Sequence, residues 1–580
     1  MTVEGTPAGD TGPGPVDPLV EVPLDTPAPI SETEAEKQAR TNEGVAKATG
    51  ILALGNIISR VLGLLREITL ANLFGASAAV DAFNVAVVVP KGLYDLLIGG
   101  HVNGAIIPVM SEITAKDGKA ALWRLVSVLV SMLLAVLSLL VLILQAGAPL
   151  VVDLVGGGLD APTQALATTL LRLTSPALIF MGLFAVLSST LYALRDFTWP
   201  AFATAVFNGV VVLAMLLFTP PPQIQANLSG VQIDWAIARP DNGITAAAMG
   251  WLLGAVAYML LQLPGLRGAS LRLTLNWQHP AIRKIGLLYL PVMFSLVLDI
   301  LVIRIFSYNL ATEIMNDGGV TIMNLATTLI QFPQGLVATA ISIAILPTLS
   351  RQAALFVESA EDRDAFKNTL GLGLRLAITL IIPAAVGLFV LATPIVALIF
   401  GHGAFTASDG EMTVQALRLY LLGLPFAAVD LLLVYAFYAR QDTLTPALIG
   451  LFSLMVYMVV ALLLAPTYGL FSLMIADSVK HVVHAAISGV IFNRRVGGLG
   501  EQNLLDTVLR TGAAAVGLAL TGVALLFLIG DSLSGGTLTE LVWVLVTGGV
   551  SGAVFLVLAY LLRLEELRWL VAIVRRRVGR

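Results

Sequence analysis

Long runs of apolar residues without a single charge are the feature that most constrains the fold of this chain. Two examples are Leu125–Leu144 and Thr511–Ile529. As a helix, a run of about 20 apolar residues crosses the roughly 30 Å hydrocarbon core of a bilayer. Only 12% of the residues are charged, about half the share of a typical soluble domain. Because the chain shows no closed-barrel alternation, the sequence predicts an all-α polytopic membrane protein.

Apolar runs bounded by charges, glycine or proline predict about fourteen transmembrane helices. Their expected ranges are 45–72, 78–100, 121–146, 164–193, 199–218, 244–265, 285–310, 319–349, 368–393, 411–438, 443–464, 469–492, 508–529 and 538–562. The Pro- and Gly-rich segment 1–43 is expected to be a disordered tail, and 564–580 a basic tail.

The distribution of basic residues predicts the orientation of the chain. If the N-terminus is cytoplasmic, nearly all Lys and Arg residues outside the helices fall in cytoplasmic segments, and the opposite loops contain only Arg239. Cytoplasmic loops of membrane proteins carry this excess. The even number of helices then places both termini in the cytoplasm.

The composition excludes several classes of function. The chain has no cysteine, which excludes disulfides, thiolate metal sites and cysteine nucleophiles. Its five histidines do not form an HExxH pattern, and no nucleotide-binding loop or nucleophile elbow is present. We therefore expect neither an enzyme nor an ATP-driven pump, and neither a metal site nor a nucleic-acid partner.

Ionisable residues inside predicted membrane helices are functional candidates, because a charge in hydrocarbon costs at least a few kcal/mol. The first predicted helix carries Arg60 and Arg66. Six residues of helix separate them by about 9 Å along the axis, and the planar guanidinium binds phosphate oxygens in pairs. They are candidates for binding a pyrophosphate. The structural alternative is an ion pair of Arg66 with Glu67 or Asp81.

Other predicted helices also carry ionisable residues, most of which fit more than one role. Asp81 lies near the start of the second helix, where a carboxylate favours the positive end of the helix dipole, so capping or gating is as reasonable as substrate binding. Lys91 and Asp95 are four residues apart and are positioned to neutralise each other. The seventh helix carries Asp299 and Arg304. The twelfth contains Asp477, Lys480, His481 and His484, which suit either an internal ion pair or a proton relay.

Five stretches of the sequence carry a recognisable pattern. The most specific is SRVLGLLREITLANLFGASAAVDAFNVAVVVPKGLYDLLIGGHVNGAIIPVMSE at 59–112. The others are RDFTWPAFATAVFN at 195–208, QFPQGLVATAISIAILPTLS at 331–350, FGHGAFTASD at 400–409 and FYARQDTLTPALIG at 437–450. These motifs, in this order, resemble those of the MurJ/MviN family, lipid II flippases of the MOP exporter superfamily, and the resemblance covers about 45–495.

The resemblance implies two six-helix lobes, 44–266 and 280–495, around a central cationic cavity that opens alternately to each side. The last two helices, within 505–563, would form a hydrophobic groove for a lipid tail. The implied substrate is lipid II, an undecaprenyl pyrophosphate that carries a disaccharide-pentapeptide for the cell wall. Transport in the bacterial cytoplasmic membrane would depend on the membrane potential or on a cation, Na⁺ or H⁺, with no other cofactor.

The resemblance also assigns roles to residues. Arg60, Arg66 and Asp81 match functional positions of the family. Elsewhere the chain departs: Tyr94, Gly99, Thr328 and Gln331 replace charged residues of the family, and a cation-binding aspartate of some members falls at Ile303, one turn from Asp299. We expect Lys91 and Arg304 to supply part of the missing positive charge for the substrate, and Asp81 and Asp299 to act in gating or cation binding.

Two alternatives remain open from the sequence. The replaced positions are compatible with a different cargo, such as another polyprenyl-linked glycan or an amphipathic molecule. The two tails are compatible with a membrane scaffold that recruits cell-wall machinery and does not transport.

Overall fold

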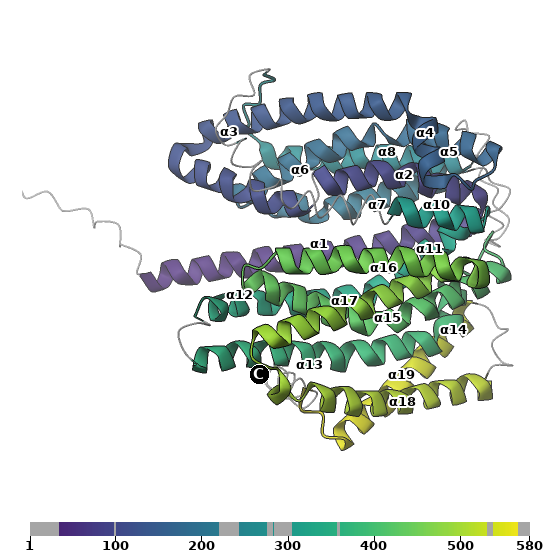
Figure 1. Cartoon of the computed structure of the whole chain (residues 1–580). Helices are drawn as coiled ribbons and strands as arrows, with labels where there is room; N and C mark the ends of the chain where they lie inside the picture. Colours follow the sequence, from purple (N-terminus) through teal and green to yellow (C-terminus); the bar gives the residue numbers. More distant parts are fainter. Residues whose placement is uncertain are drawn as a thin grey trace, which may run out of the picture. The chain divides into compact units, whose positions relative to one another are not determined.

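The computed structural model describes residues 34–97, 100–219, 243–274, 282, 304–355, 360–529 and 537–566. The chain forms two units, Met1–Gly50 and Ile51–Arg580. In the first unit, the described residues 34–50 are helical. The second unit is built from helices throughout its described part (Figure 1), which confirms the predicted all-α fold.

Eleven helices among the described residues are long and apolar enough to span a membrane. All eleven fall on predicted ranges. Two further predicted spans are the helices α1 (Glu34–Phe74) and α2 (Ala78–Leu97). Each carries at least three charged residues in its apolar stretch, which lowers its hydropathy. The remaining predicted span, 285–310, is described only from Arg304 onwards.

The first half of the second unit consists of helices that pack in pairs, and one of them, α3, is bent. Its helices are α3 (Gly100–Ala146), α4 (Ala148–Gly156), α5 (Ala161–Thr174), α6 (Ala177–Ala193), α7 (Thr198–Phe218) and α8 (Ile244–Leu260), followed by a 3₁₀ turn at Leu263–Leu266. Helix α7 packs on α8, α3 on α6, and α2 on α5. Helix α3 bends at Gly118, whose φ of 78° favours glycine.

The second half contains a helix that changes from α- to π-helical winding after Pro333. Its elements are α10 (Arg304–Ile314), α11 (Gly319–Pro333), the π-helical segment η4 (Gln334–Thr339), α12 (Ala340–Leu355), α13 (Ala360–Val390), α14 (Ala392–Phe400), α15 (Ala407–Ala439), α16 (Leu444–Tyr468) and α17 (Phe471–Arg495). Pro333 lacks the amide hydrogen that would continue the α-helical pattern. The π-helical segment follows directly after it.

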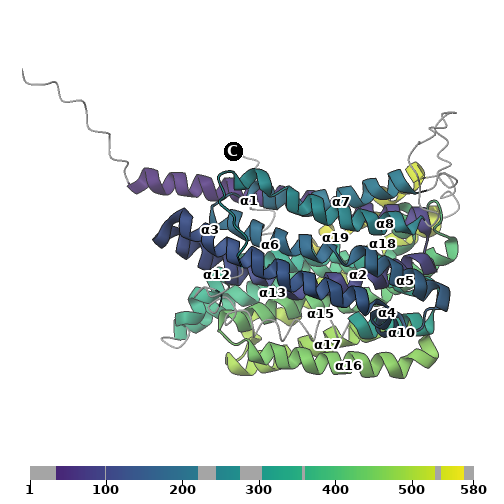
Figure 2. The same ribbon diagram turned by 90° about the horizontal axis from the view of Figure 1, so that it is seen from above.

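The remaining helices are α18 (Leu504–Ile529) and α19 (Thr537–Leu561), preceded by a 3₁₀ turn at Gly500–Gln502. Helix α18 packs on α13, and α19 packs on α18 and α14. In Figure 1 the two are the light green and yellow helices beside α13 and α14. Figure 2 shows α15, α16 and α17 side by side, in agreement with their extensive packing.

One buried cluster joins both halves of the second unit. It includes Val85, Trp251, Ala326 and Leu473, which come from α2, α8, α11 and α17. By contrast, one face of α16 exposes a row of large apolar side chains: Leu448, Phe452, Met455, Val459 and Leu463. Exposing such a stripe to water is unfavourable, whereas contact with lipid is not. The stripe therefore indicates a lipid-facing surface.

Two details of the sequence prediction are wrong. Helix α1 begins at Glu34, so the described part of the expected disordered tail, 34–43, is helical; residues 1–33 lie outside the described part. The predicted helix 164–193 coincides with one candidate span, Ala161–Ala193, but it is not continuous, because α5 ends at Thr174 and α6 begins after Pro176.

Candidate functional site

A polar cavity of about 500 Å³ lies where α1, α2, α7, α8, α10, α11 and α15–α17 meet. Its charged lining comes from both halves of the sequence: Arg66, Glu67, Lys91, Arg304, Asp477, Lys480 and His481. The structure therefore brings together three of the predicted substrate-binding residues, Arg66, Lys91 and Arg304. Thr328 and Gln331, two of the positions where a charge was expected by resemblance, also line it.

Arg66 is held in a defined position at the cavity wall. Its Nη1 donates to Oδ1 of Asn208 at 3.0 Å, and its Nη2 lies 2.5 Å from Oε1 of Glu67. The guanidinium carbon lies 5.8 Å from the centre of the Trp251 ring, within the range of a cation–π contact. Asn208 also donates to the Ser59 carbonyl at 3.3 Å. The predicted Arg66–Glu67 pair is thus present, and Asp81 takes no part in it.

The remaining cavity charges are mostly paired within their own helices. Nζ of Lys91 lies 2.8 Å from Oδ2 of Asp95, and Nζ of Lys480 lies 2.6 Å from Oδ1 of Asp477. Both expected pairs are confirmed. Arg304 has no carboxylate partner among the described residues. The described lining contains four cationic and two carboxylate side chains with histidine neutral, and this excess of positive charge suits a dianion.

Arg60 does not line this cavity. Its Nε donates to Oδ1 of Asn56 at 3.3 Å, and its Nη1 reaches the Gln331 carbonyl at the end of α11. A Cβ at Gly335 would lie 2.4 Å from Nη1 of Arg60, so any larger residue at this position would displace the guanidinium. Arg60 and Arg66 therefore have separate surroundings.

Asp81 forms a cap across two helices. It is fully buried in α2, and its Oδ1 accepts from the Thr321 amide at 2.8 Å and the Thr321 hydroxyl at 2.5 Å. The Val320 amide lies 3.4 Å from Oδ2. The first amides of a helix lack partners within the helix, and α11 has no side-chain cap from its own N-cap residue, Gly318. Asp81 supplies that cap from α2. The sequence interpretation had Asp81 capping its own helix, whereas the helix that it caps is α11.

The other family positions are distributed differently. The Tyr94 hydroxyl lies 3.5 Å from the hydroxyl of Tyr258, and Tyr94 is not part of the cavity lining. Gly99 and Asp299 lie outside the described residues.

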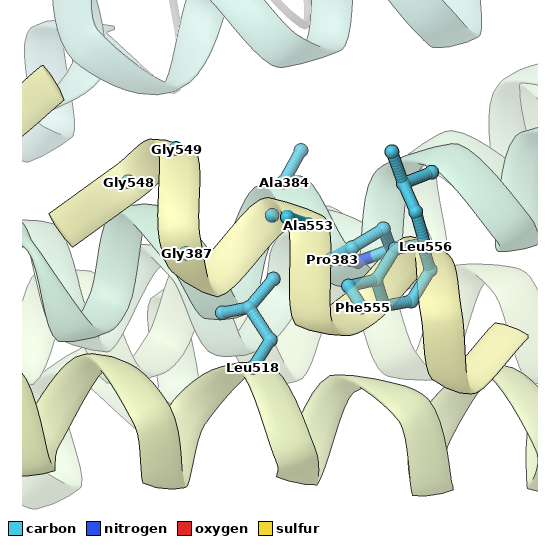
Figure 3. Close-up of a pocket in the computed structure, with 10 residues that line it drawn as sticks. Pro383, Ala384, Gly387, Leu518, Gly548, Gly549, Ala553, Phe555 and Leu556 are labelled. Carbon is cyan, nitrogen blue, oxygen red and sulfur yellow. The ribbon is translucent and has the colours of Figure 1, made fainter. Parts of the chain in front are cut away.

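A second hollow, of about 540 Å³, lies between α13, α18 and α19. Figure 3 shows Pro383, Ala384 and Gly387 on one wall, Leu518 on another, and glycines and apolar side chains of α19 on the third. The wall residues of α19 are Gly548, Gly549, Gly552, Ala553, Phe555 and Leu556. The lining contains no ionisable side chain, so this groove suits a hydrocarbon chain.

Comparison with known proteins shows the family. The family model described as "Lipid II flippase MurJ" matches residues 70–547, which is most of the chain. The chain belongs to the MurJ family. A probable MurJ lipid II flippase of Vibrio cholerae is 30% identical over 461 residues, covering 78% of this chain and 83% of the relative. A MurJ lipid II flippase of Burkholderia cenocepacia is 31% identical over 403 residues, covering 68% and 73%.

Solved structures agree with this at the level of the fold. A MurJ lipid II flippase in an inward closed conformation aligns with a TM-score of 0.70 and 21% identity, covering 89% of this chain and 99% of that one. A multidrug transporter of the MOP superfamily in an inward-facing conformation aligns with a TM-score of 0.60 and 17% identity. The predicted MurJ resemblance is confirmed. Because MurJ is a family of flippases, the prediction of a multi-pass membrane transporter and not an enzyme is confirmed as well.

The sequence did not reveal three residues that organise the site. Asn208 orients Arg66, Thr321 binds Asp81, and Trp251 lies against the Arg66 guanidinium. Asn208 closes the motif at 195–208, and a polar residue in an apolar helix was the available signal. Thr321 and Trp251 carry no local signal, since their roles come from contacts between distant helices.

Proposed function

We propose that this chain moves lipid II from the inner to the outer leaflet of the bacterial cytoplasmic membrane by alternating access. The observation that carries the proposal is the positive excess of the central cavity, with four cationic and two carboxylate side chains in its described lining. A pyrophosphate diester is a dianion, and arginine binds such oxygens through two parallel hydrogen bonds. Arg66, Lys91 and Arg304 are the residues proposed to contact it.

The groove of α13, α18 and α19 is proposed to hold the polyprenyl chain. A long hydrocarbon gains about 0.8 kcal/mol for each methylene removed from water. A groove with no ionisable side chain offers this gain without the cost of burying a charge. The cargo would then be bound in two places, its charged part in the cavity and its chain in the groove.

The transport cycle is proposed to use two lobes, 44–266 and 280–495, with both termini in the cytoplasm. Asp81 of the first lobe caps α11 of the second. Breaking and reforming this contact would accompany the opening of one side of the cavity. Asp81 and Asp299 are proposed as gating or cation-binding residues, and the membrane potential or a cation as the source of energy. An anion that moves outward is favoured by a potential that is negative inside.

A second candidate is the transport of another polyprenyl-linked glycan. Thr328 and Gln331 line the cavity and are neutral where the resemblance implies charges. This difference alters the surroundings of the head group and leaves the groove unchanged. The second candidate therefore predicts the same lipid chain with a different sugar or peptide.

Complementation is the test of the proposed function. The chain is expressed in a bacterium whose own lipid II flippase is depleted, and growth and lipid II on the outer leaflet are measured. We expect the wild type to restore both, and Arg66→Ala to lower lipid II exposure by about tenfold or more, since losing a hydrogen bond to a charged group costs about 1.5–3 kcal/mol. The control is Arg172→Ala, which removes an arginine outside the cavity lining.

Two results would contradict parts of this proposal. Full rescue by Arg66→Ala would rule out the cavity arginine as the pyrophosphate contact. A wild-type chain that inserts into the membrane yet exposes no lipid II would rule out lipid II as the cargo. The polyprenyl lipids that co-purify with the chain would then identify the second candidate's cargo.

A further inference from the structure

A second layer of titratable side chains lies behind the cavity wall, between α15 and α17. Nδ1 of His484 contacts Oδ1 of Asp430, and these side chains are 12% and 13% exposed. The Ser488 hydroxyl donates to the same carboxylate oxygen at 3.4 Å. On the other side of the imidazole, a Cβ at Gly450 of α16 would lie 3.8 Å from Nε2. His484 is thus enclosed by three helices, with a carboxylate as its ionic partner.

One helical turn connects this pair to the cavity. His481, which lines the cavity, precedes His484 by three residues and so lies on the same face of α17. Its Nε2 lies 3.7 Å from Oδ2 of Asp477. His481 is also within electrostatic range of Asp430 and His484. The two layers form one continuous network of ionisable groups that leads away from the cargo site.

The charges of this network do not balance without a proton. It holds two carboxylates (Asp430 and Asp477), one ammonium group (Lys480) and two imidazoles, so its net charge is negative when both imidazoles are neutral. Among the described residues, three tyrosines of α15 and α16 interact with it: Tyr420, Tyr438 and Tyr457. Phenols do not supply a compensating positive charge. A single added proton makes the network neutral.

An anionic cargo increases the need for that proton. The cavity lining and the network share Asp477, Lys480 and His481. With a dianion beside the four cations and two carboxylates of the lining, no positive charge is left over for Asp430, nor for Asp95, the partner of Lys91. In a region of low dielectric an uncompensated charge is costly. Proton binding next to Asp430 removes this cost, so anion and proton favour each other's binding.

We propose that His484 and Asp430 form a proton-binding site that is loaded together with the anionic cargo. This rests on the proposed function to the extent that the cargo carries a pyrophosphate. The proton forms an N–H bond on the imidazole of His484, comes from water in the cavity through His481, and returns to water when the cargo leaves. Linkage requires that the proton raises the affinity for the anion by the same factor by which the anion raises the affinity for the proton.

The experiment counts the protons bound with the anion. Purified full-length protein is titrated calorimetrically with a short-chain prenyl diphospho-N-acetylglucosamine, in buffers of different ionisation enthalpy, between about pH 6 and pH 8 where an imidazole ordinarily changes charge. The probe is a diphosphate diester, which keeps its own charge in this range. We expect an uptake of about one proton per bound anion for the wild type, and an affinity that increases as the pH falls.

Three variants decide the assignment. His484→Gln and Asp430→Asn should lose the proton uptake, whereas the control His402→Gln, in the connection between α14 and α15, should keep it. His484→Lys carries a permanent charge in contact with Asp430; it should bind the anion with an affinity that no longer depends on pH. Its binding also shows that a change at this position leaves the protein folded.

The possible failures are distinguishable. Anion binding with the same proton uptake in His484→Gln and the wild type would overturn the proton site and leave the proposed function standing. Anion binding by the wild type without any proton uptake would do the same. If the wild type bound no diphosphate diester, both the proton site and the pyrophosphate cargo would be wrong.

Discussion

Two hollows of similar volume in the described part of this protein have linings of opposite character. The central cavity, of about 500 Å³, carries arginine, lysine, histidine and carboxylate side chains. The groove of α13, α18 and α19, of about 540 Å³, is lined by glycine, alanine, proline, leucine and phenylalanine (Figure 3). A single amphipathic molecule would match both linings, its charged head group the cavity and its long hydrocarbon chain the groove.

The difference also concerns how each hollow is built. Side chains shape the cavity, and ion pairs and hydrogen bonds fix them: Arg66 with Glu67 and Asn208, and Lys480 with Asp477. The groove exists because side chains are small, with glycines at 548, 549 and 552. Binding in the cavity should therefore be weakened by substitutions that remove a charged or polar side chain, and binding in the groove by substitutions that add a larger one. Four predictions follow this contrast.

The largest effect on stability is expected at an ion pair beside the groove. Nε of Arg375 in α13 lies 2.8 Å from Oε1 of Glu566, just after α19, and these side chains are 20% and 4% exposed. Arg375→Met leaves Glu566 buried without a counter-charge, which should lower the free energy of unfolding by about 3 kcal/mol. Thermal unfolding in detergent measures this.

A matched control uses an exposed pair. Lys116 and Glu112 lie 2.8 Å apart with side chains 70% and 41% exposed, so Lys116→Met should change the free energy of unfolding by no more than about 0.5 kcal/mol. Equal losses for Arg375→Met and Lys116→Met would show that the Arg375 pair does not hold the groove walls together.

The next effect is expected at the cap that links α2 to α11. Asp81→Asn replaces a carboxylate that accepts from two backbone amides and one hydroxyl. The loss of charge-assisted hydrogen bonds in a buried site should cost about 2 kcal/mol. Transport should fall together with stability, because the cap is proposed to open during the cycle.

Asp160→Asn is the control for the cap. Asp160 accepts from the Thr163 amide at the start of its own helix, α5, and asparagine is an equally good N-cap residue. This variant should retain both stability and transport. Unchanged transport in Asp81→Asn would mean that the contact between α2 and α11 is a structural cap without a gating role.

Gly552→Leu tests the groove by filling it. A Cβ at this position meets no atom within 4 Å, so the leucine side chain enters open space. If it displaces two methylene groups of a bound chain, the affinity for a long-chain lipid should fall by about 1.6 kcal/mol, or about fifteenfold. Binding of a short-chain analogue with the same head group should be unchanged.

The size of the added side chain provides the control. Gly552→Ala should have a much smaller effect on long-chain binding than Gly552→Leu. An equal loss for short- and long-chain ligands would contradict the division of labour between cavity and groove.

The helices were predictable from the sequence because a membrane span leaves a local signal. Every described span coincides with an apolar run, since about 20 apolar residues must follow one another. The breaks were less visible. The interruption at Ser175 and Pro176 lies within a stretch whose length and mean hydropathy fit a single span, and the bend at Gly118 depends on one backbone angle.

The candidate site was predictable only where its contacts are local. The pairs Lys91–Asp95 and Asp477–Lys480 follow from helical spacing. Arg66 meets Asn208 across 142 residues of sequence, and Asp81 meets Thr321 across 240. No spacing rule connects residues so far apart, so these partners depend on how the helices pack.

The smallest effect is expected away from both hollows, at Asp442 between α15 and α16. Burial raises the pKa of this carboxyl, but hydrogen bonds from Thr445 and the ion pair with Arg495 outweigh it and lower the pKa from its ordinary 3.8. A lowered pKa stabilises the fold above the pKa of the unfolded chain, and this stability is lost as the pH falls through the folded value.

Arg495 is 47% exposed, so Asp442→Asn should cost only about 0.5 kcal/mol near neutral pH. The free energies of unfolding of the variant and the wild type should converge as the pH falls through the lowered pKa of Asp442, while binding of both ligand classes stays unchanged. A stability difference that grew with acidity would reverse the sign of this argument.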